Sequence, residues 1–359
     1  MENVNGLSLD LLVHPGETIK EILDDKNMSQ EELAIRTGYS PKHISEVVRG
    51  KKDISSEFAN ALEYAFGISS NFWMNLQNNY NKKVIEIKNL NSIQKEEFDI
   101  LKQLNEVVKY CENTNIIETS SKKEITILSL RRLLNVNNLA SISNLAIPQA
   151  AFRGSKKIKT NIYVLYAWQK LCEISIRDIN LSQKYDANKL KTKFEDIKST
   201  MFLPAKKMIV ELKKIFAECG IIFDVMKNFT GAPVQGFIQK KNEQVVLCMT
   251  IRQAFADIFW FTLFHEIGHL LNNDFNDQYI DYQFTDSEIE QNADLFAQNT
   301  LINNDDYQKF AKKEQHTDKE IIEFAKQQNV KPFIIVGRIQ SELNDYTYKS
   351  KFKDRYIWG

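Results

Sequence analysis

The stretch FWFTLFHEIGHLLNND, Phe259–Asp274, places two histidines and a glutamate inside an otherwise apolar run. Since the chain has only five histidines in 359 residues, two in one segment are unusual. On a helix, His265 and His269 project from one face about a turn apart, which lets two imidazoles reach one metal ion. Glu266 lies where a carboxylate can accept a proton from a water molecule at the metal without being a ligand. A histidine pair that only packs in the core is the alternative.

A catalytic zinc site needs a third protein ligand and an open fourth position. The segment SEIEQNADLFAQNTLI, residues 287–302, has apolar residues at helical spacing and puts Glu290 and Asp294 on one face. Glu290 follows His269 by 21 residues, enough for a loop and an antiparallel return. We expect both histidines and Glu290 to bind Zn²⁺, and Glu266 to act as the general base. We expect Asp294 to accept the second N–H of a ligand histidine.

This order of motifs, H-E-x-x-H and then E-x-x-x-D on a second helix, is similar to that of the gluzincin metallopeptidases. Upstream, residues 236–252 indicate a β-hairpin whose polar turn lies at residues 240–243. Zincins carry a strand beside the active-site helix, and a free strand edge can pair with an extended peptide. The residues expected to form that substrate strand are Val245, Val246, Leu247, Cys248 and Met249. A purely structural hairpin is the alternative, and Tyr279 or Tyr282 is a candidate to stabilise the oxyanion.

The first 80 residues carry the start and stop signals of several short helices. A capping box over Ser29–Glu32 predicts a helix from Gln30 that Gly38 ends. A second helix should begin at Pro41, after the cap residue Ser40, and stop at Gly50. Two short helices joined by a tight turn form a helix-turn-helix, whose second helix enters the major groove. The residues expected to meet bases or phosphates are Lys42, His43, Ser45, Glu46 and Arg49, followed by Lys51 and Lys52.

The charge of this region favours DNA binding only locally. Residues 1–82 contain eight Lys or Arg against twelve Asp or Glu, so the region as a whole is acidic. Between residues 40 and 52, however, four basic residues face one acidic residue, Glu46. The predicted groove-facing helix is therefore positively charged, which favours DNA binding. The alternative is that the region is a small helical bundle with no role in DNA binding.

Residues 14–80 resemble the XRE-type helix-turn-helix domain of HigA-family antitoxins and related repressors. The resemblance is carried by HPGE at residues 14–17, the Ser29 and Ser40 caps, and Phe72-Trp73. It implies operator DNA as a partner, a phosphate contact by Gln30 and base contacts from the start of the second helix, including Ser40.

Residues 124–340 are similar to the ImmA/IrrE metallopeptidases, through segments such as GIIFDV, DIFWFTLFHEIGHLL and NVKPFIIVGRIQ. The resemblance implies limited cleavage of a helix-turn-helix repressor or antitoxin, which relieves repression. The alternative function is a HigA-like antitoxin or repressor whose peptidase fold is a sensor or toxin-binding scaffold. A toxin and a second copy of the chain are further possible partners.

Composition sets the remaining expectations. The formal net charge is zero and the start MENVNGLSLD lacks the apolar region of a signal peptide, so we expect a cytoplasmic protein without a membrane partner. The four cysteines form no C-x-x-C pair and should be core thiols. We predict an α+β, mostly helical protein in three parts. These are an all-α helix-turn-helix domain (1–82), a helical connecting region (83–200) and a zincin-like, gluzincin-type peptidase domain with a small β-sheet (201–359).

Overall fold

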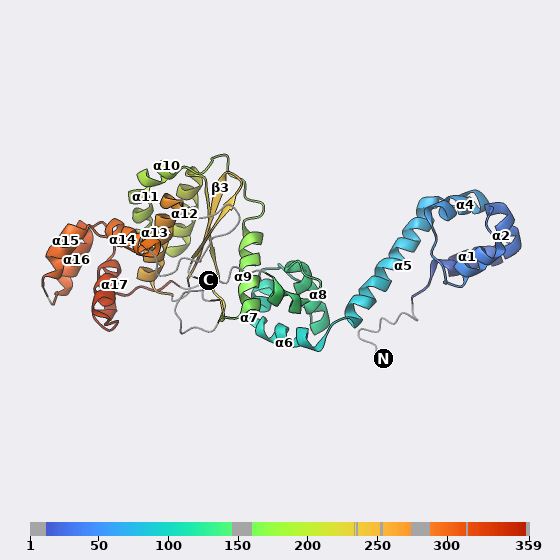
Figure 1. The fold of residues 1–359 in the computed structure, drawn as a ribbon, viewed down its shortest axis with the longest axis horizontal. Helices are drawn as coiled ribbons and strands as arrows, with labels where there is room; N and C mark the ends of the chain where they lie inside the picture. The colour runs from blue at the N-terminus through green and yellow to red at the C-terminus, as the bar shows by residue number, and fades with distance from the viewer. Residues whose placement is uncertain are drawn as a thin grey trace. The chain divides into compact units, whose positions relative to one another are not determined.

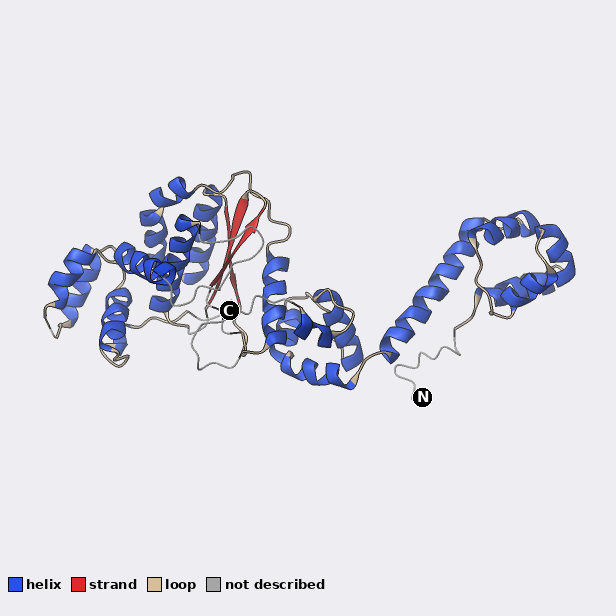
Figure 2. Ribbon diagram, in the orientation of Figure 1, coloured by secondary structure: helices blue, strands red, loops and turns tan. Residues whose placement is uncertain are grey.

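The computed structural model describes residues 12–145, 160–232, 234, 236–251, 254–273, 288–313 and 315–356. The chain packs as two compact units, one formed by residues 1–98 and 119–130, the other by residues 99–118 and 131–359. In the described residues the first unit is helical, and the second combines helices with one three-stranded sheet (Figures 1 and 2). The predicted mostly helical α+β class is confirmed.

The first unit is a bundle of short helices followed by a longer one. Its helices are α1 (Pro15–Asp25), α2 (Gln30–Thr37), α3 (Pro41–Val48), α4 (Ser56–Phe66) and α5 (Ser70–Asn91). Two further helices, α6 (Lys95–Gln103) and α8 (Lys123–Leu133), extend across the division between the units. Apolar side chains from α1 to α5, including Ile19, Leu33, Ile44, Phe58 and Trp73, form one buried core. Burial of this shared apolar face stabilises helices that are too short to persist alone.

The predicted boundaries of the helix-turn-helix are confirmed. Ser29 Oγ accepts a hydrogen bond from Glu32 N at 3.1 Å, and Ser40 Oγ accepts one from His43 N at 3.2 Å. Gly38 ends α2 with φ 73°, and Gly50 follows α3 with φ 67°. In a full capping box the Glu32 carboxylate would also accept from the backbone N–H of Ser29. Here that carboxylate instead pairs with Arg36 at 2.7 Å.

The predicted division at residue 82 falls inside α5, which continues to Asn91 without interruption. Residues 83–200, expected to connect two domains, are shared between the two compact units. Their helical character is as expected, but most of them belong to the second unit.

The second unit surrounds a small mixed sheet. Its elements are α7 (Asn105–Asn113), η3 (Leu139–Asn144), α9 (Ile162–Ser175), α10 (Ala187–Thr192), α11 (Phe194–Ser199), η5 (Thr200–Phe202), α12 (Ala205–Glu218), β1 (Ile221–Met226), β2 (Gly236–Lys241), β3 (Gln244–Thr250), α13 (Ala256–Asn272), α14 (Glu288–Leu301), α15 (Asn304–Ala311), α16 (Asp318–Gln327), α17 (Pro332–Leu343) and η6 (Ser350–Phe352). The strand order is β1-β3-β2, with β1 parallel and β2 antiparallel to β3.

The predicted hairpin is present as β2 and β3, but its role as a substrate edge is wrong for β3. Residues Val245–Met249 lie in the central strand, whose backbone pairs with β1 on one side and β2 on the other. Their side chains are buried. A strand paired on both sides has no free edge for an added peptide. Among the described strands the edges are β1 and β2, and β2 is the one beside α13.

The two faces of the sheet carry different helices. On one face, Cys248 of β3 lies 3.1 Å from Cys172 of α9, sulfur to sulfur, and Phe237 of β2 packs on Trp168 of α9. The opposite face includes Phe223 of β1, which stacks on Phe216 of α12. Since side chains alternate along a strand, the register places Gly236 and Met249 on this opposite face as well. The apolar helix α13 packs against this part of the sheet.

Contacts from distant segments hold both ends of α13. Ala256 N donates to Asp354 O at 3.0 Å and Tyr356 N donates to Ala254 O at 2.7 Å, so residues 354–356 pair with the chain that enters the helix. Trp260 Nε1 donates to Tyr356 Oη at 2.9 Å. At the other end, Tyr185 Oη donates to Leu270 O at 2.5 Å. The helix that carries the histidine motif is therefore fixed at its first and last turns.

The structure bears on two expectations that came from composition, one about the cysteines and one about membrane spans. All four cysteines are buried free thiols, as predicted. In the described part of the chain, no helix is both long and apolar enough to cross a membrane.

Candidate metal centre and groove-facing helix

The structure brings together the three side chains that the sequence suggests as metal ligands. His265 and His269 of α13 and Glu290 of α14 offer ligand atoms within 4.8 Å of one another. The two Nε2 atoms are 3.0 Å apart, and Glu290 oxygens lie 3.2 Å from His265 Nε2 and 3.6 Å from His269 Nε2. Two atoms bound tetrahedrally to zinc at ~2.1 Å would be about 3.4 Å apart. The donor types and their spacing fit Zn²⁺.

Asp294 occupies the position expected of a group that orients a ligand histidine. Its Oδ1 lies 2.7 Å from His265 Nδ1, one turn along α14 from Glu290. Burial lowers the pKa of His265, but hydrogen bonds to Asp294 and Glu290 and the charge of Glu266 outweigh it and raise the pKa to about 10. A cation that displaces the Nε2 proton leaves Nδ1 donating to Asp294, so that Nε2 presents its lone pair to the cation.

Removing this contact should weaken metal binding without abolishing it. We expect Asp294→Ala to raise the zinc dissociation constant roughly 10- to 100-fold, because His265 loses the acceptor that fixes its ring and its tautomer. Competition with a chromogenic chelator measures the constant. Glu288→Ala is the matched control, an exposed acid at the start of the same helix. Equal affinities for the two variants would show that Asp294 does not support the ligand.

Glu266 is half-buried between α13 and the sheet. Burial raises the pKa of its carboxyl group, and the neighbouring histidines oppose that shift. A methyl group on Gly236 of β2 would come within 2.7 Å of Glu266 Oε1. The start of β2 therefore lies directly against the candidate base. The spacing of residues in the sequence does not predict this contact between Gly236 and Glu266.

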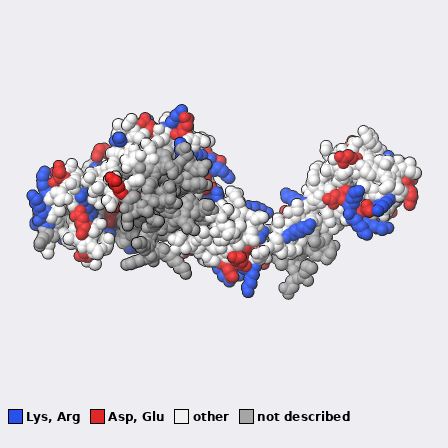
Figure 3. Space-filling model, in the orientation of Figure 1, with Lys and Arg blue, Asp and Glu red and all other residues white. Residues whose placement is uncertain are grey.

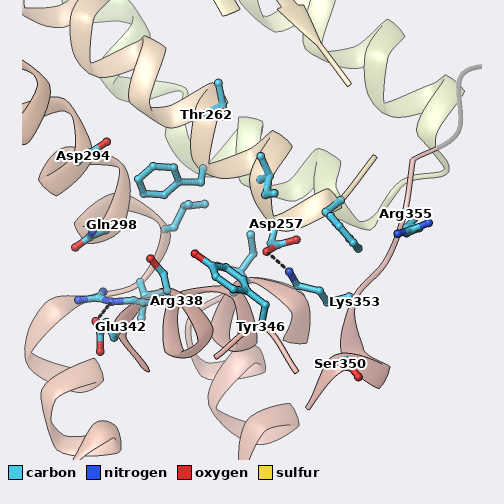
Figure 4. Close-up of a pocket in the computed structure, with 18 residues that line it drawn as sticks. Asp257, Thr262, Asp294, Gln298, Arg338, Glu342, Tyr346, Ser350, Lys353 and Arg355 are labelled. Carbon is cyan, nitrogen blue, oxygen red and sulfur yellow. Dashed lines mark hydrogen bonds and ion pairs between the residues drawn. The ribbon is translucent and has the colours of Figure 1, made fainter. Parts of the chain in front are cut away.

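A pocket of about 890 Å³ lies along the first half of α13 (Figure 4). Residues of α14, α17 and the segment 346–355 complete its walls. Figure 4 shows Asp257 paired with Lys353, at 3.3 Å, and Arg338 paired with Glu342, at 3.2 Å. Among the described residues, Asp294 lines the pocket but the three candidate ligands do not, so Asp294 connects the pocket with the candidate metal site.

The residues predicted to contact DNA lie on or beside α3, and most are exposed. The exposed members are Ser40, Lys42, Arg49, Lys51 and Lys52; Gln30 and Ser45 are half-buried. Glu46 is also half-buried, and its Oε1 lies 3.9 Å from Lys42 Nζ. Figure 3 shows Lys and Arg side chains close together on the visible face of this unit, with acidic side chains beside them.

His43 differs from its expected groove-facing position. Its ring lies against Tyr39 and Phe58, with centroid distances of 4.5 and 4.9 Å. Lys52 Nζ lies 3.0 Å from Nδ1, and Nε2 is buried without a hydrogen-bond partner. The ring therefore packs against two aromatic side chains, and its exposed nitrogen, Nδ1, is paired with Lys52.

Other elements of the site come from segments that no motif marks. Tyr185 and residues 354–356 fix α13, and only the folded chain brings them there. Tyr279 and Tyr282, the candidates for oxyanion stabilisation, lie outside the described residues.

Comparisons with known proteins match one segment near the start of the chain and one in its C-terminal part. Residues 19–73 match the family model for the helix-turn-helix, and residues 258–340 match that for the IrrE N-terminal-like domain. The HTH-type transcriptional regulator YddM of Escherichia coli is 32% identical over 80 residues, which cover 21% of this chain and 85% of YddM. Virulence-associated protein I of Dichelobacter nodosus is 35% identical over 75 residues, 21% of this chain and 69% of that protein.

Among solved structures, the Pseudomonas aeruginosa antitoxin HigA with the higBA promoter is 33% identical. The match covers 22% of this chain and 86% of that chain, with a TM-score of 0.21. By its sequence relatives and family matches, the chain belongs to the XRE-type helix-turn-helix family and carries an IrrE/ImmA-like peptidase-family domain in its C-terminal part.

Proposed function

We propose that the protein is a DNA-binding transcriptional regulator with a zinc-dependent endopeptidase domain that cleaves a repressor- or antitoxin-type partner. The observation that carries the proposal is the convergence of His265, His269 and Glu290, with Glu266 next to the first ligand on α13. A metal site with only a structural role needs the ligands but no adjacent base. The membership in an IrrE N-terminal-like family supports a peptidase.

Zn²⁺ held by these three side chains would supply Lewis-acid chemistry, polarising a peptide carbonyl and making water more acidic. Glu266 then accepts the proton of the attacking water and returns it to the leaving amine. Burial raises the pKa of the Glu266 carboxyl group toward neutral pH. A group that both accepts and donates a proton is most efficient when its pKa lies near the working pH. Asp294 keeps His265 oriented during these steps.

The DNA-binding part of the proposal rests on the exposed basic residues of α3 and the turn after it. We expect Lys42→Ala/Arg49→Ala to weaken binding to the protein's own promoter. The slope of log affinity against log salt should fall by about one for each phosphate that the variant no longer neutralises. Fluorescence anisotropy at several salt concentrations measures both quantities. The control, Lys83→Ala/Lys88→Ala, makes the same charge change on α5. If both pairs behave alike, α3 has no special role in DNA binding.

The competing function is an antitoxin or repressor whose peptidase fold binds a toxin or a signal without cutting. One experiment separates the two. Zinc-loaded protein is incubated with the product of the neighbouring gene, and the mixture is analysed by intact-mass spectrometry. A discrete pair of fragments supports the peptidase. An uncut, stable complex with a toxin supports the scaffold.

A further inference from the structure

The strand β2 comes unusually close to the candidate catalytic base at one residue. An ideal Cβ built on Gly236 would lie 2.7 Å from Glu266 Oε1, 3.0 Å from its Cγ and 3.1 Å from its Cδ. Contacts under 3.0 Å essentially never occur for real Cβ atoms. All three atoms belong to one side chain, so the conflict is with Glu266 alone among the nearest neighbours.

Backbone conformation does not require a glycine at this position. The described glycines with positive φ are Gly38, Gly50, Gly67, Gly220 and Gly231. Gly236 instead pairs with Met249 in an ordinary antiparallel register, which any residue can adopt. A glycine inside a strand gives up side-chain packing, and it commonly marks a close approach by another group. Here that group is a carboxylate.

We propose that Gly236 is a positioning residue, whose missing side chain provides the space that the Glu266 carboxylate occupies beside the metal ligands. Neither element can retreat easily if that space is filled. β2 is paired with β3 along its length. The ends of α13 are held by Tyr185 and by residues 354–356. An added methyl group must therefore turn the carboxylate away from its place.

The test has two parts. A measurement of kcat rests on the proposed peptidase function, whereas a measurement of melting temperature needs no activity. We make Gly236→Ala in three zinc-loaded full-length backgrounds: unchanged, Glu266→Gln and Glu266→Ala. Glutamine has the shape of glutamate, so the methyl group should cost a melting-temperature drop on the order of 5 °C in the first two backgrounds. In Glu266→Ala the obstructing atoms are gone, and the drop should vanish.

Gly268→Ala is the control substitution in the same three backgrounds. Its methyl group would meet Ala293 and Phe296 of α14 at 3.2 Å, a conflict that does not involve residue 266. Its cost should be the same in all three. An equal cost of Gly236→Ala in every background, or no cost in any, would overturn the inference.

The kinetic arm compares Gly236→Ala with the unchanged protein on a cleaved partner. We expect kcat to fall on the order of 10- to 100-fold, with KM and zinc content within about twofold, because the base is misplaced while the ligands remain. An unchanged kcat would contradict the positioning role. If the unchanged protein cuts no partner, the proposed function fails, and the melting-temperature cycle still decides whether Gly236 makes room for Glu266.

Discussion

Replacing Glu266 with glutamine should leave a zinc-loaded, folded protein that no longer cleaves its partner. Glutamine keeps the size of the side chain and can still form hydrogen bonds, but it cannot accept a proton from water. Loss of a general base typically lowers rates by about 10²–10⁴-fold, so single-turnover cleavage should fall by that amount. Because Glu266 is not among the three ligand residues, zinc content should remain at the level of the unchanged protein.

The same variant also separates the two functions in cells. Glu266→Gln should bind promoter DNA normally, since α3 belongs to the other compact unit. If proteolysis relieves repression, a promoter reporter should stay repressed in this variant after induction. Full derepression would refute the peptidase proposal and leave the scaffold function. Loss of zinc together with cleavage would instead make Glu266 a structural residue.

Replacing His265 with alanine should remove the metal. We expect about one Zn²⁺ per chain in the unchanged protein and close to none in His265→Ala, because two remaining ligands hold zinc too weakly to survive dialysis. Elemental analysis measures the ratio. Cleavage should be lost together with the metal, and the thermal transition of the second unit should fall, because binding energy to the folded site contributes to stability.

His43→Ala provides the control for non-specific binding by histidine. The chain has five histidines, and this variant removes one that lies in the first unit, away from the candidate ligands. Its zinc content should therefore not change. Full retention of zinc by His265→Ala would show that the ligand assignment is wrong. A protein that binds no zinc in its unchanged form would overturn the metal site as a whole.

Features set by neighbouring residues were predictable from the sequence. Serine caps at residues 29 and 40 start helices because their hydroxyl groups accept free backbone N–H groups a turn ahead, and this needs only local sequence. The spacing of His265 and His269 works in the same way, since helix geometry alone puts them on one face. The pairing of Asp294 with His265 required one further assumption, an antiparallel return of the second helix.

Features set by distant contacts were not predictable in this way. The hairpin of β2 and β3 was expected, but whether β3 is an edge depends on β1, which joins it through parallel pairing. His43 was expected to face the groove, but its ring packs against Tyr39 and against Phe58, and the contact with Phe58 depends on how α4 folds back onto α3. Gly236 carries no motif, and its role depends on how closely one strand approaches one helix.

The pairing of residues 354–356 with the start of α13 links the metal helix to the order of synthesis. Every candidate ligand has left the ribosome well before Asp354 and Tyr356 are made, yet the first turn of the helix lacks their hydrogen bonds until then. A nascent chain therefore carries the ligands before it has a rigid helix to display them. The proposed active site therefore matures after the helix-turn-helix, whose core contacts lie within the first 80 residues and can form earlier in synthesis.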